Sequence, residues 1–158
     1  MNLRAGGRLA EIASRVPFGA RVLDVGCDHG YVPIRLALSG QAAEIYASDI
    51  RLGPLGAAVR NAERYGVAER INFYLEDGIP EKLAGLVDTV IIAGMGGETI
   101  AGILARAPEM PGGVFFILQP QTKVGVLLAY LGERGFVEVK LAEVYEGRRK
   151  YTIITGET

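Results

Sequence analysis

The stretch that decides the fold reads Val22-Leu23-Asp24-Val25-Gly26-Cys27-Asp28-His29-Gly30-Tyr31. Residues 21–25 form an apolar strand, two glycines mark a tight turn, and residues 31–38 have the pattern of a helix. Glycine lets the backbone approach a ligand closely, and the first turn of a helix offers free N–H groups. The order of strand, glycine turn and helix therefore predicts a nucleotide pocket at this turn.

Composition limits the class of protein. A chain of 158 residues is long enough for one domain with a single sizeable core. Its formal net charge of −1 means that no global field steers it to nucleic acid, although a local basic face stays possible. The single cysteine, Cys27, excludes an internal disulfide and is typical of a reducing compartment.

The sequence also bears on location and on metals. The first 16 residues carry several charges and lack the apolar segment of a signal peptide. No apolar run reaches the ~18 residues that a membrane helix needs, and no Cys/His cluster has the spacing of metal ligands. We therefore expect a cytoplasmic protein with no membrane partner and no metal. The sequence leaves open whether it is a monomer or a homodimer.

Strand and helix patterns alternate along the chain. Apolar runs that end at turn residues predict strands over 21–26, 43–47, 71–75, 89–93 and 113–118. Amphipathic patterns predict helices over 3–16, 31–38, 54–65, 99–107 and 122–134. Alternating residues predict a hairpin of strands 136–145 and 150–154 around a turn at 146–149. This order is typical of an α/β fold: a Rossmann-like, doubly wound, seven-stranded, mostly parallel sheet with an antiparallel C-terminal hairpin.

Acidic and glycine-rich residues lie at or just after the ends of the predicted strands. They are Asp24, Asp49, Asp77-Gly78, Gly94 to Gly97 and Gln119-Pro120. Doubly wound sheets bind ligands beyond the carboxyl ends of their strands, so we expect all of these residues on one edge of the sheet.

Three nucleotide ligands compete for such an edge. A dinucleotide site has the pattern G-x-G-x-x-G, but here Asp28 stands in place of the middle glycine and would oppose a pyrophosphate. No G-K-[ST] triplet is present, which excludes a P-loop. S-adenosylmethionine carries a sulfonium, an ammonium and a ribose but no phosphate, so carboxylates favour it. We therefore interpret the pocket as a site for S-adenosylmethionine, with S-adenosylhomocysteine as the product.

The acidic series resembles that of the class I S-adenosylmethionine-dependent methyltransferases. The resemblance is carried by Asp24-x-Gly26, Asp49 and Asp77. It implies that Asp24 and the turn residues Gly26, Cys27 and Gly30 shape the methionine side of the pocket. It also implies that Asp49, with Ile50 beside it, binds the ribose, and that Asp77 and Gly78 bind the adenine.

A narrower resemblance covers residues 8–151. It rests on residues 24–33 together with Gly53-Pro54-Leu55, Asp77-Gly78, Ile92 to Gly97 and Leu118-Gln119-Pro120. In combination these motifs resemble the bacterial tRNA (adenine(22)-N(1))-methyltransferase family, TrmK. The resemblance implies methyl transfer to N1 of an adenine at position 22 of tRNA. That family carries a further C-terminal helical domain, which is absent here, so we expect residues 1–158 to form a single methyltransferase domain.

The chemistry indicates which residues act. Adenine N1 is a neutral nucleophile at pH 7, so transfer needs alignment with the methyl group and an acceptor for the positive charge that develops. We expect Asp28, or the carbonyls of Gly94 and Met95, to be that acceptor, and His29 and Tyr31 to orient the base or stack on it.

The substrate side of the site involves further residues. Small residues from Gly94 to Gly97 leave room for a flipped base, so we expect Gly96 and Gly97 to face the substrate together with Gln119 and Pro120. Two basic groups are candidate phosphate contacts: Arg4, Arg8, Arg15 and Arg21 near the start, and Arg148-Arg149-Lys150 in the final hairpin.

Two other functions stay open at this point. One is a small-molecule methyltransferase with the same cofactor pocket. The other is a non-catalytic module that binds S-adenosylmethionine and serves as a partner or a sensor.

Overall fold

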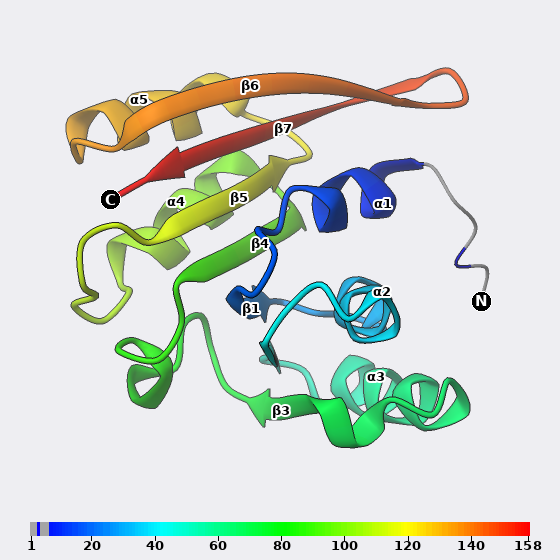
Figure 1. Cartoon of the computed structure of the whole chain (residues 1–158). Coiled ribbons are helices and arrows are strands. Elements are labelled where there is room, and N and C mark those ends of the chain that lie inside the picture. The colour runs from blue at the N-terminus through cyan, green and yellow to red at the C-terminus, as the bar shows by residue number, and fades with distance from the viewer. Residues whose placement is uncertain (1–2, 4–6) are drawn as a thin grey trace.

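One twisted sheet of seven strands organises the computed structural model, which describes residue 3 and residues 7–158 (Figure 1). The strands are β1 (Arg21–Val25), β2 (Glu44–Asp49), β3 (Ile71–Leu75), β4 (Thr89–Met95), β5 (Phe115–Pro120), β6 (Val137–Glu146) and β7 (Arg149–Glu157). Their order is β3-β2-β1-β4-β5-β7-β6. Strands β1 to β5 pair in parallel, and β7 lies antiparallel to both β5 and β6. The predicted fold class is confirmed.

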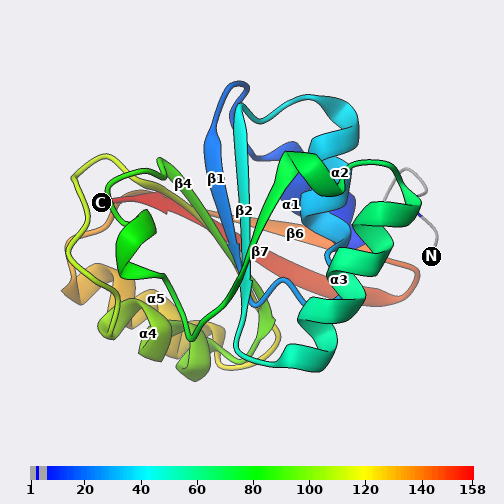
Figure 2. The same ribbon diagram turned by 90° about the horizontal axis from the view of Figure 1, so that it is seen from below.

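Helices cover both faces of the sheet. They are α1 (Gly7–Ser14), α2 (Tyr31–Ser39), α3 (Leu52–Arg64), α4 (Gly97–Ala105) and α5 (Val124–Glu133), with short 3₁₀ turns at Ala68–Arg70 and Glu81–Leu83. Figure 2 shows α1, α2 and α3 on one face and α4 and α5 on the other. Each face has its own apolar core. Central strands buried on both sides explain the nearly continuous apolar runs in the sequence.

The position of β1 in the interior of the sheet creates the crevice for a ligand. Strand β1 pairs with β2 on one side and with β4 on the other. The chain therefore runs outward from β1 to β3 and then returns to start again at β4. Such a reversal of strand order separates the loops that follow β1 and β4, and ligands bind between them in doubly wound sheets.

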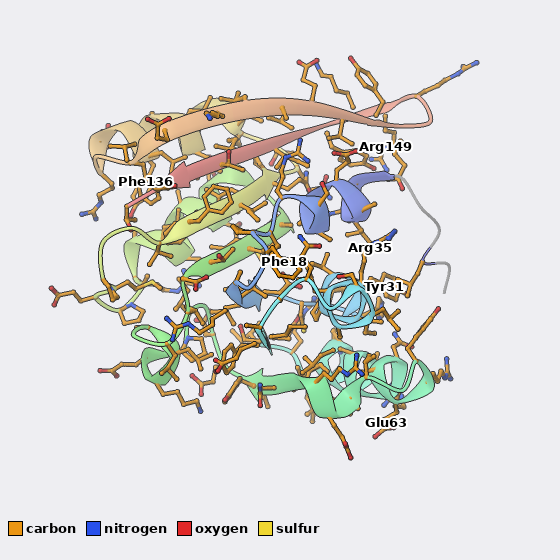
Figure 3. The ribbon with its side chains drawn as sticks, viewed as in Figure 1. Phe18, Tyr31, Arg35, Glu63, Phe136 and Arg149 are labelled. Carbon is orange, nitrogen blue, oxygen red and sulfur yellow. The ribbon has the colours of Figure 1, made fainter. Side chains whose placement is uncertain are left out.

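The C-terminal hairpin closes one edge of the sheet and also supports α1. Helix α1 packs on β6, and Val144 of β6 lies in the same buried cluster as Ile12 of α1. Figure 1 shows the hairpin running past α1, and Figure 3 shows Arg149 close to the turn of that hairpin. The hairpin therefore fixes where α1 sits.

Several element boundaries differ from the predictions. Strand β2 continues through Ser48 and Asp49, because both residues pair with β3. Strand β4 continues past residue 93 to Met95, with a bulge at Gly94. Strand β5 begins at Phe115 rather than at residue 113, and β7 extends to Glu157 rather than ending at residue 154. In each case pairing with a neighbouring strand moves the boundary.

The helix boundaries also shift by a few residues, as is usual at helix ends. Helix α3 begins at Leu52, two residues before the predicted start. Helix α4 covers Gly97–Ala105 rather than 99–107, and α5 covers Val124–Glu133 rather than 122–134. The first helix is described from Gly7 to Ser14, and the part of its predicted range at residues 4–6 lies outside the described residues. The hairpin turn is confined to residues 147–148, because Glu146 pairs with Arg149.

Candidate functional site

A cavity of about 690 Å³ lies at the carboxyl ends of the central strands. Its size is within the range of small-molecule sites. Most residues that the sequence singled out line it: Arg8, Asp24, Gly26, Cys27, Asp28, His29, Tyr31, Asp49, Ile50, Asp77, Gly78, Gly94 and Met95. The fold thus brings together motifs that lie far apart in the chain.

Asp24 is one of two buried acids that line the cavity, with Asp49. It is the second-to-last residue of β1, which ends at Val25, and 6% of its surface is exposed. Among the described residues, none donates a hydrogen bond to its side chain. The pKa of Asp24 is raised to about 8, mainly by burial; the charges of Asp49 and Asp28 contribute to this rise, and the charge of Arg8 opposes it. A buried carboxylate that faces a cavity without a hydrogen-bond donor is suited to a cationic ligand.

The glycine turn is held by the end of β2. The Cys27 amide donates to the carbonyl of Ser48 at 2.8 Å, and the Asp28 amide donates to Asp49 Oδ2 at 3.0 Å. The other oxygen of Asp49, Oδ1, accepts the Arg51 amide at 2.9 Å. Asp49 is 2% exposed, so this carboxylate is a fixed part of the turn.

Asp28 adopts a left-handed backbone conformation, with φ of 52°. Its side chain is 59% exposed and lies at the mouth of the cavity, 3.8 Å from His29 Nε2 and 3.7 Å from Arg51 Nη2. The rings of His29 and Tyr31 lie 5.8 Å apart. The predicted acceptor group of Asp28, His29 and Tyr31 is therefore one cluster at the cavity mouth.

A salt bridge between Arg106 and Asp77 also lines the cavity. Arg106 Nη2, at the end of α4, donates to Asp77 Oδ1 at 2.9 Å, and both side chains are about half exposed. The carbonyl of Gly78 accepts the Ser48 hydroxyl at 3.2 Å. Thus Gly78 is anchored to β2, while the Asp77 carboxylate stays accessible.

The bulge in β4 forms one wall. Gly94 has φ of +76°, which favours glycine. The side chain of Met95 lies against Gly26, and its terminal methyl group occupies the space that a Cβ on Gly26 would need. The carbonyl of Met95 accepts the Gln121 amide at 2.7 Å.

Six of the predicted site residues do not line the cavity: Gly30, Gly96, Gly97, Gln119, Pro120 and Arg148. Gly30 packs against Ala58 of α3, and Gly97 packs against the backbone of Lys123. Gln119 is completely buried behind the wall. Arg148 is exposed in the hairpin turn. A direct ligand contact by any of these six residues stays a prediction.

Some lining residues were missed by the sequence reasoning. They include Arg51, Thr99, Arg106 and Gln121. Arg51 follows the acid at the end of β2 by two positions, which is a usable signal. Arg106 lies 29 residues after its partner Asp77, so only the packing of α4 brings the two together.

The remaining chemistry of the site is limited. Burial, followed by the charges of Asp24, Asp49 and Asp28, raises the pKa of Cys27, so its thiol stays protonated. Among the residues that the structure describes, no group of three or more His, Cys, Asp or Glu side chains could hold a metal ion. In the same part of the chain, no helix is long and apolar enough to cross a membrane.

Comparison with known proteins places these observations in a family. The family described as "Methyltransferase domain" matches residues 5–154. The tRNA (adenine(22)-N(1))-methyltransferase of Bacillus subtilis is 31% identical over 98% of this chain, which spans 66% of that protein. This chain therefore spans about two thirds of the length of that relative.

Solved structures agree with this placement. The crystal structure of the B. subtilis m1A22 tRNA methyltransferase TrmK matches with a TM-score of 0.89 and 30% identity, over 99% of this chain and 68% of that one. A Streptococcus pneumoniae protein, described as a putative tRNA (m1A22) methyltransferase in complex with S-adenosyl-L-methionine, matches with a TM-score of 0.83 and 34% identity, over 96% and 72% of the two chains. The chain belongs to the methyltransferase domain family and, within it, to the TrmK family of tRNA (adenine(22)-N(1))-methyltransferases.

Proposed function

We propose that this chain transfers a methyl group from S-adenosylmethionine to N1 of an adenine in tRNA, at position 22. The observation that carries the proposal is the buried Asp24 carboxylate, which faces the cavity without a hydrogen-bond donor from the described residues. A ligand that places an ammonium beside this carboxylate and ribose hydroxyls beside Asp49 fits the two hydrogen-bond acceptors. A pyrophosphate does not fit them, because the carboxylates of Asp28 and Asp49 would repel the phosphates.

The residues present can hold each part of that cofactor. Asp24 suits the ammonium, and Arg8, whose charge acts on Asp24 inside the cavity, suits the carboxylate of the same amino acid group. We therefore assign Arg8 to the cofactor rather than to an RNA phosphate. Asp49 and Ile50 suit the ribose, and Asp77 with Gly78 suits the adenine. When bound, S-adenosylmethionine supplies the electrophilic methyl group.

The acceptor side lies at the cavity mouth. The half-exposed cluster of Asp28, His29 and Tyr31 borders the same cavity as the Gly94-Met95 wall. The aromatic rings can stack on an extruded base, and the Asp28 carboxylate can accept the positive charge that spreads to the adenine amine. The Met95 carbonyl already accepts the Gln121 amide, which favours Asp28 over that carbonyl as the acceptor.

Contacts with RNA follow from the arginines that have no internal partner. Arg15 pairs with Glu11, Arg21 pairs with Asp88, and Lys150 pairs with Glu143. Arg60 and Arg64 of α3 are exposed, and within the described part of the chain neither forms a salt bridge or a side-chain hydrogen bond. They share the solvent face of α3, four residues apart. We assign phosphate contacts to this face of α3. A tRNA substrate would place the reaction in the cytoplasm.

Methyl transfer from labelled S-adenosylmethionine to unmodified tRNA tests the proposal. The expected product is 1-methyladenosine at position 22, and the Asp28→Ala variant is expected to lose more than about tenfold in turnover while it still binds cofactor. Transfer to a small molecule but not to RNA would favour a small-molecule methyltransferase. Cofactor binding without transfer to any acceptor would favour a non-catalytic module. Binding of NADH or ATP in place of S-adenosylmethionine would overturn the assignment of the pocket.

A further inference from the structure

We propose that Gln119 is a positioning residue that couples the cofactor side of the cavity to its acceptor wall. The inference rests on the proposed function. Gln119 does not line the cavity, yet it contacts a residue on each side of it through one side-chain oxygen.

The contacts of Gln119 fix the orientation of its amide. The side chain is completely buried near the end of β5. Its Oε1 accepts hydrogen bonds from Arg8 Nη1 at 2.9 Å and from the Gly94 amide at 3.1 Å, and its Nε2 donates to the Pro120 carbonyl at 3.2 Å. Arg8 and the Gly94 amide can only donate, and the Pro120 carbonyl can only accept. The opposite amide orientation would therefore lose all three bonds.

The first consequence concerns the acceptor wall. In the pairing of β4 with β5, Ala93 lies opposite Gln119 and Met95 lies opposite Pro120, so Gly94 is the extra residue of a bulge. A bulge changes the direction of the side chain that follows it. Here that side chain is Met95, which packs on Gly26 of the glycine turn. The hydrogen bond from Gly94 to Gln119 thus holds the bulge that places Met95.

The second consequence concerns the cofactor side. Arg8 comes from α1, 111 residues away from Gln119 in the sequence. Its guanidinium carbon lies 5.6 Å from the centre of the Tyr151 ring. An arginine has many rotamers, and a buried acceptor selects one of them. Gln119 therefore fixes Arg8 inside the cavity, where its charge acts on Asp24.

Because both donors share one oxygen, loss of the amide is expected to change two measurable quantities. Arg8→Met should raise the dissociation constant of S-adenosylhomocysteine by about tenfold or more and should lower kcat at saturating cofactor less than Gln119→Ala does. Gln119→Ala should raise the same constant and also lower kcat by about tenfold or more. In the double variant, the constant should match that of Arg8→Met alone, and kcat should match that of Gln119→Ala alone.

A readout without turnover separates this proposal from the proposed function. The chain has three methionines, so a protein with ¹³C-labelled methionine methyl groups gives few signals, and Met95→Leu identifies the signal of Met95. Gln119→Ala should shift or broaden the Met95 signal and leave the Met110 signal unchanged. Gln119→Glu serves as a second variant, since its carboxyl group keeps an acceptor for Arg8 and for the Gly94 amide. Its Met95 signal should lie closer to that of wild type than the signal of Gln119→Ala does.

The matched control is Thr89→Val. Thr89 is 1% exposed at the other end of β4, where its hydroxyl donates to Asp88. This variant also removes a buried polar group. It should leave the Met95 signal, the dissociation constant of S-adenosylhomocysteine and kcat unchanged. The proposal is overturned if Gln119→Ala leaves the Met95 signal in place, or if its effect on cofactor binding adds to that of Arg8→Met. If the wild type transferred no methyl group to tRNA, the proposed function would be wrong. The Met95 NMR signal and the dissociation constant of S-adenosylhomocysteine would still test the role of Gln119.

Discussion

The Asp28 amide donates a hydrogen bond to the carboxylate of Asp49 across 3.0 Å, and this bond joins the glycine turn after β1 to the end of β2. The same carboxylate accepts the Arg51 amide. A residue predicted only as a ribose ligand therefore also holds two backbone segments in place. Its two roles can be separated by experiment.

Asp49→Ala is expected to destabilise the cofactor-free protein by about 1–3 kcal/mol, because it leaves two backbone amides without their acceptor. Urea unfolding without cofactor measures the free energy of unfolding. The control is Asp77→Ala, whose carboxylate is half exposed and, among the described residues, pairs only with Arg106. This control should change stability by less than about 1 kcal/mol and still weaken cofactor binding. Equal stability of the Asp49 variant and the wild type would contradict the dual role.

The raised pKa of Asp24 predicts how stability changes with pH. Between about pH 4 and about pH 8, the native protein holds a proton that the unfolded chain has released. The free energy of unfolding should therefore fall as pH rises through this window. Asp24→Asn removes the effect, so without cofactor the variant should be more stable than wild type at pH 8, by on the order of 2 kcal/mol or more. Thermal unfolding at pH 5 and pH 8 checks this, and the difference should shrink at the lower pH.

The same pKa predicts that cofactor binding releases a proton. The ammonium of S-adenosylmethionine pairs with the ionised form of Asp24, whereas below about pH 8 the free protein holds this group protonated. The affinity should therefore rise with pH up to about 8, by up to about tenfold per unit. Calorimetry in buffers of different ionisation enthalpy measures the proton released. Asp77→Asn should keep this pH dependence, and a flat profile in the wild type would rule out Asp24 as the partner of the ammonium.

The contact between Gly26 and Met95 predicts a difference between two glycine substitutions. Gly26 and Gly19 have φ angles of +69° and +79°, so alanine is strained at both, by about 1–2 kcal/mol. At Gly19, apart from its two chain neighbours, no described residue has an atom within 4 Å of the added Cβ, whereas at Gly26 the Met95 methyl group must move. Both variants should lose similar stability from strain, but only Gly26→Ala should lose methyl transfer, by about tenfold or more. Thermal unfolding and an initial-rate assay on both proteins check this. Similar losses of activity in both variants would mean that Met95 has no part in the wall.

Most of the fold and much of the cavity lining could be predicted from the sequence, because both depend on local patterns. Buried parallel strands read as apolar runs, and their carboxyl ends share one edge of the sheet. The positions of the strand ends were therefore enough to predict that Asp24, Asp49 and Asp77 lie close together. All three line the cavity.

Contacts set by packing could not be predicted in this way. The pairing of Arg106 with Asp77 depends on the position of α4, and the hydrogen bond from Gly94 to Gln119 involves a bulge in the neighbouring strand. The arginines near the start looked alike in sequence, but Arg15 and Arg21 have acidic partners and Arg8 points into the cavity. Charge counts along a chain do not show which charges are already paired.

This difference between paired and unpaired arginines predicts the salt dependence of RNA binding. Each phosphate contact contributes about 0.7–0.9 to the slope of log affinity against log salt. Arg60→Gln and Arg64→Gln should each reduce that slope by about this amount, because neither arginine has an acidic partner within the described residues. Arg15→Gln and Arg21→Gln are the matched controls and should leave the slope unchanged, because Glu11 and Asp88 already neutralise those charges. Binding of unmodified tRNA, titrated from low to moderate salt, measures all four slopes. If only the controls reduce the slope, the RNA lies over the start of the chain, and the face of α3 has no part in binding it.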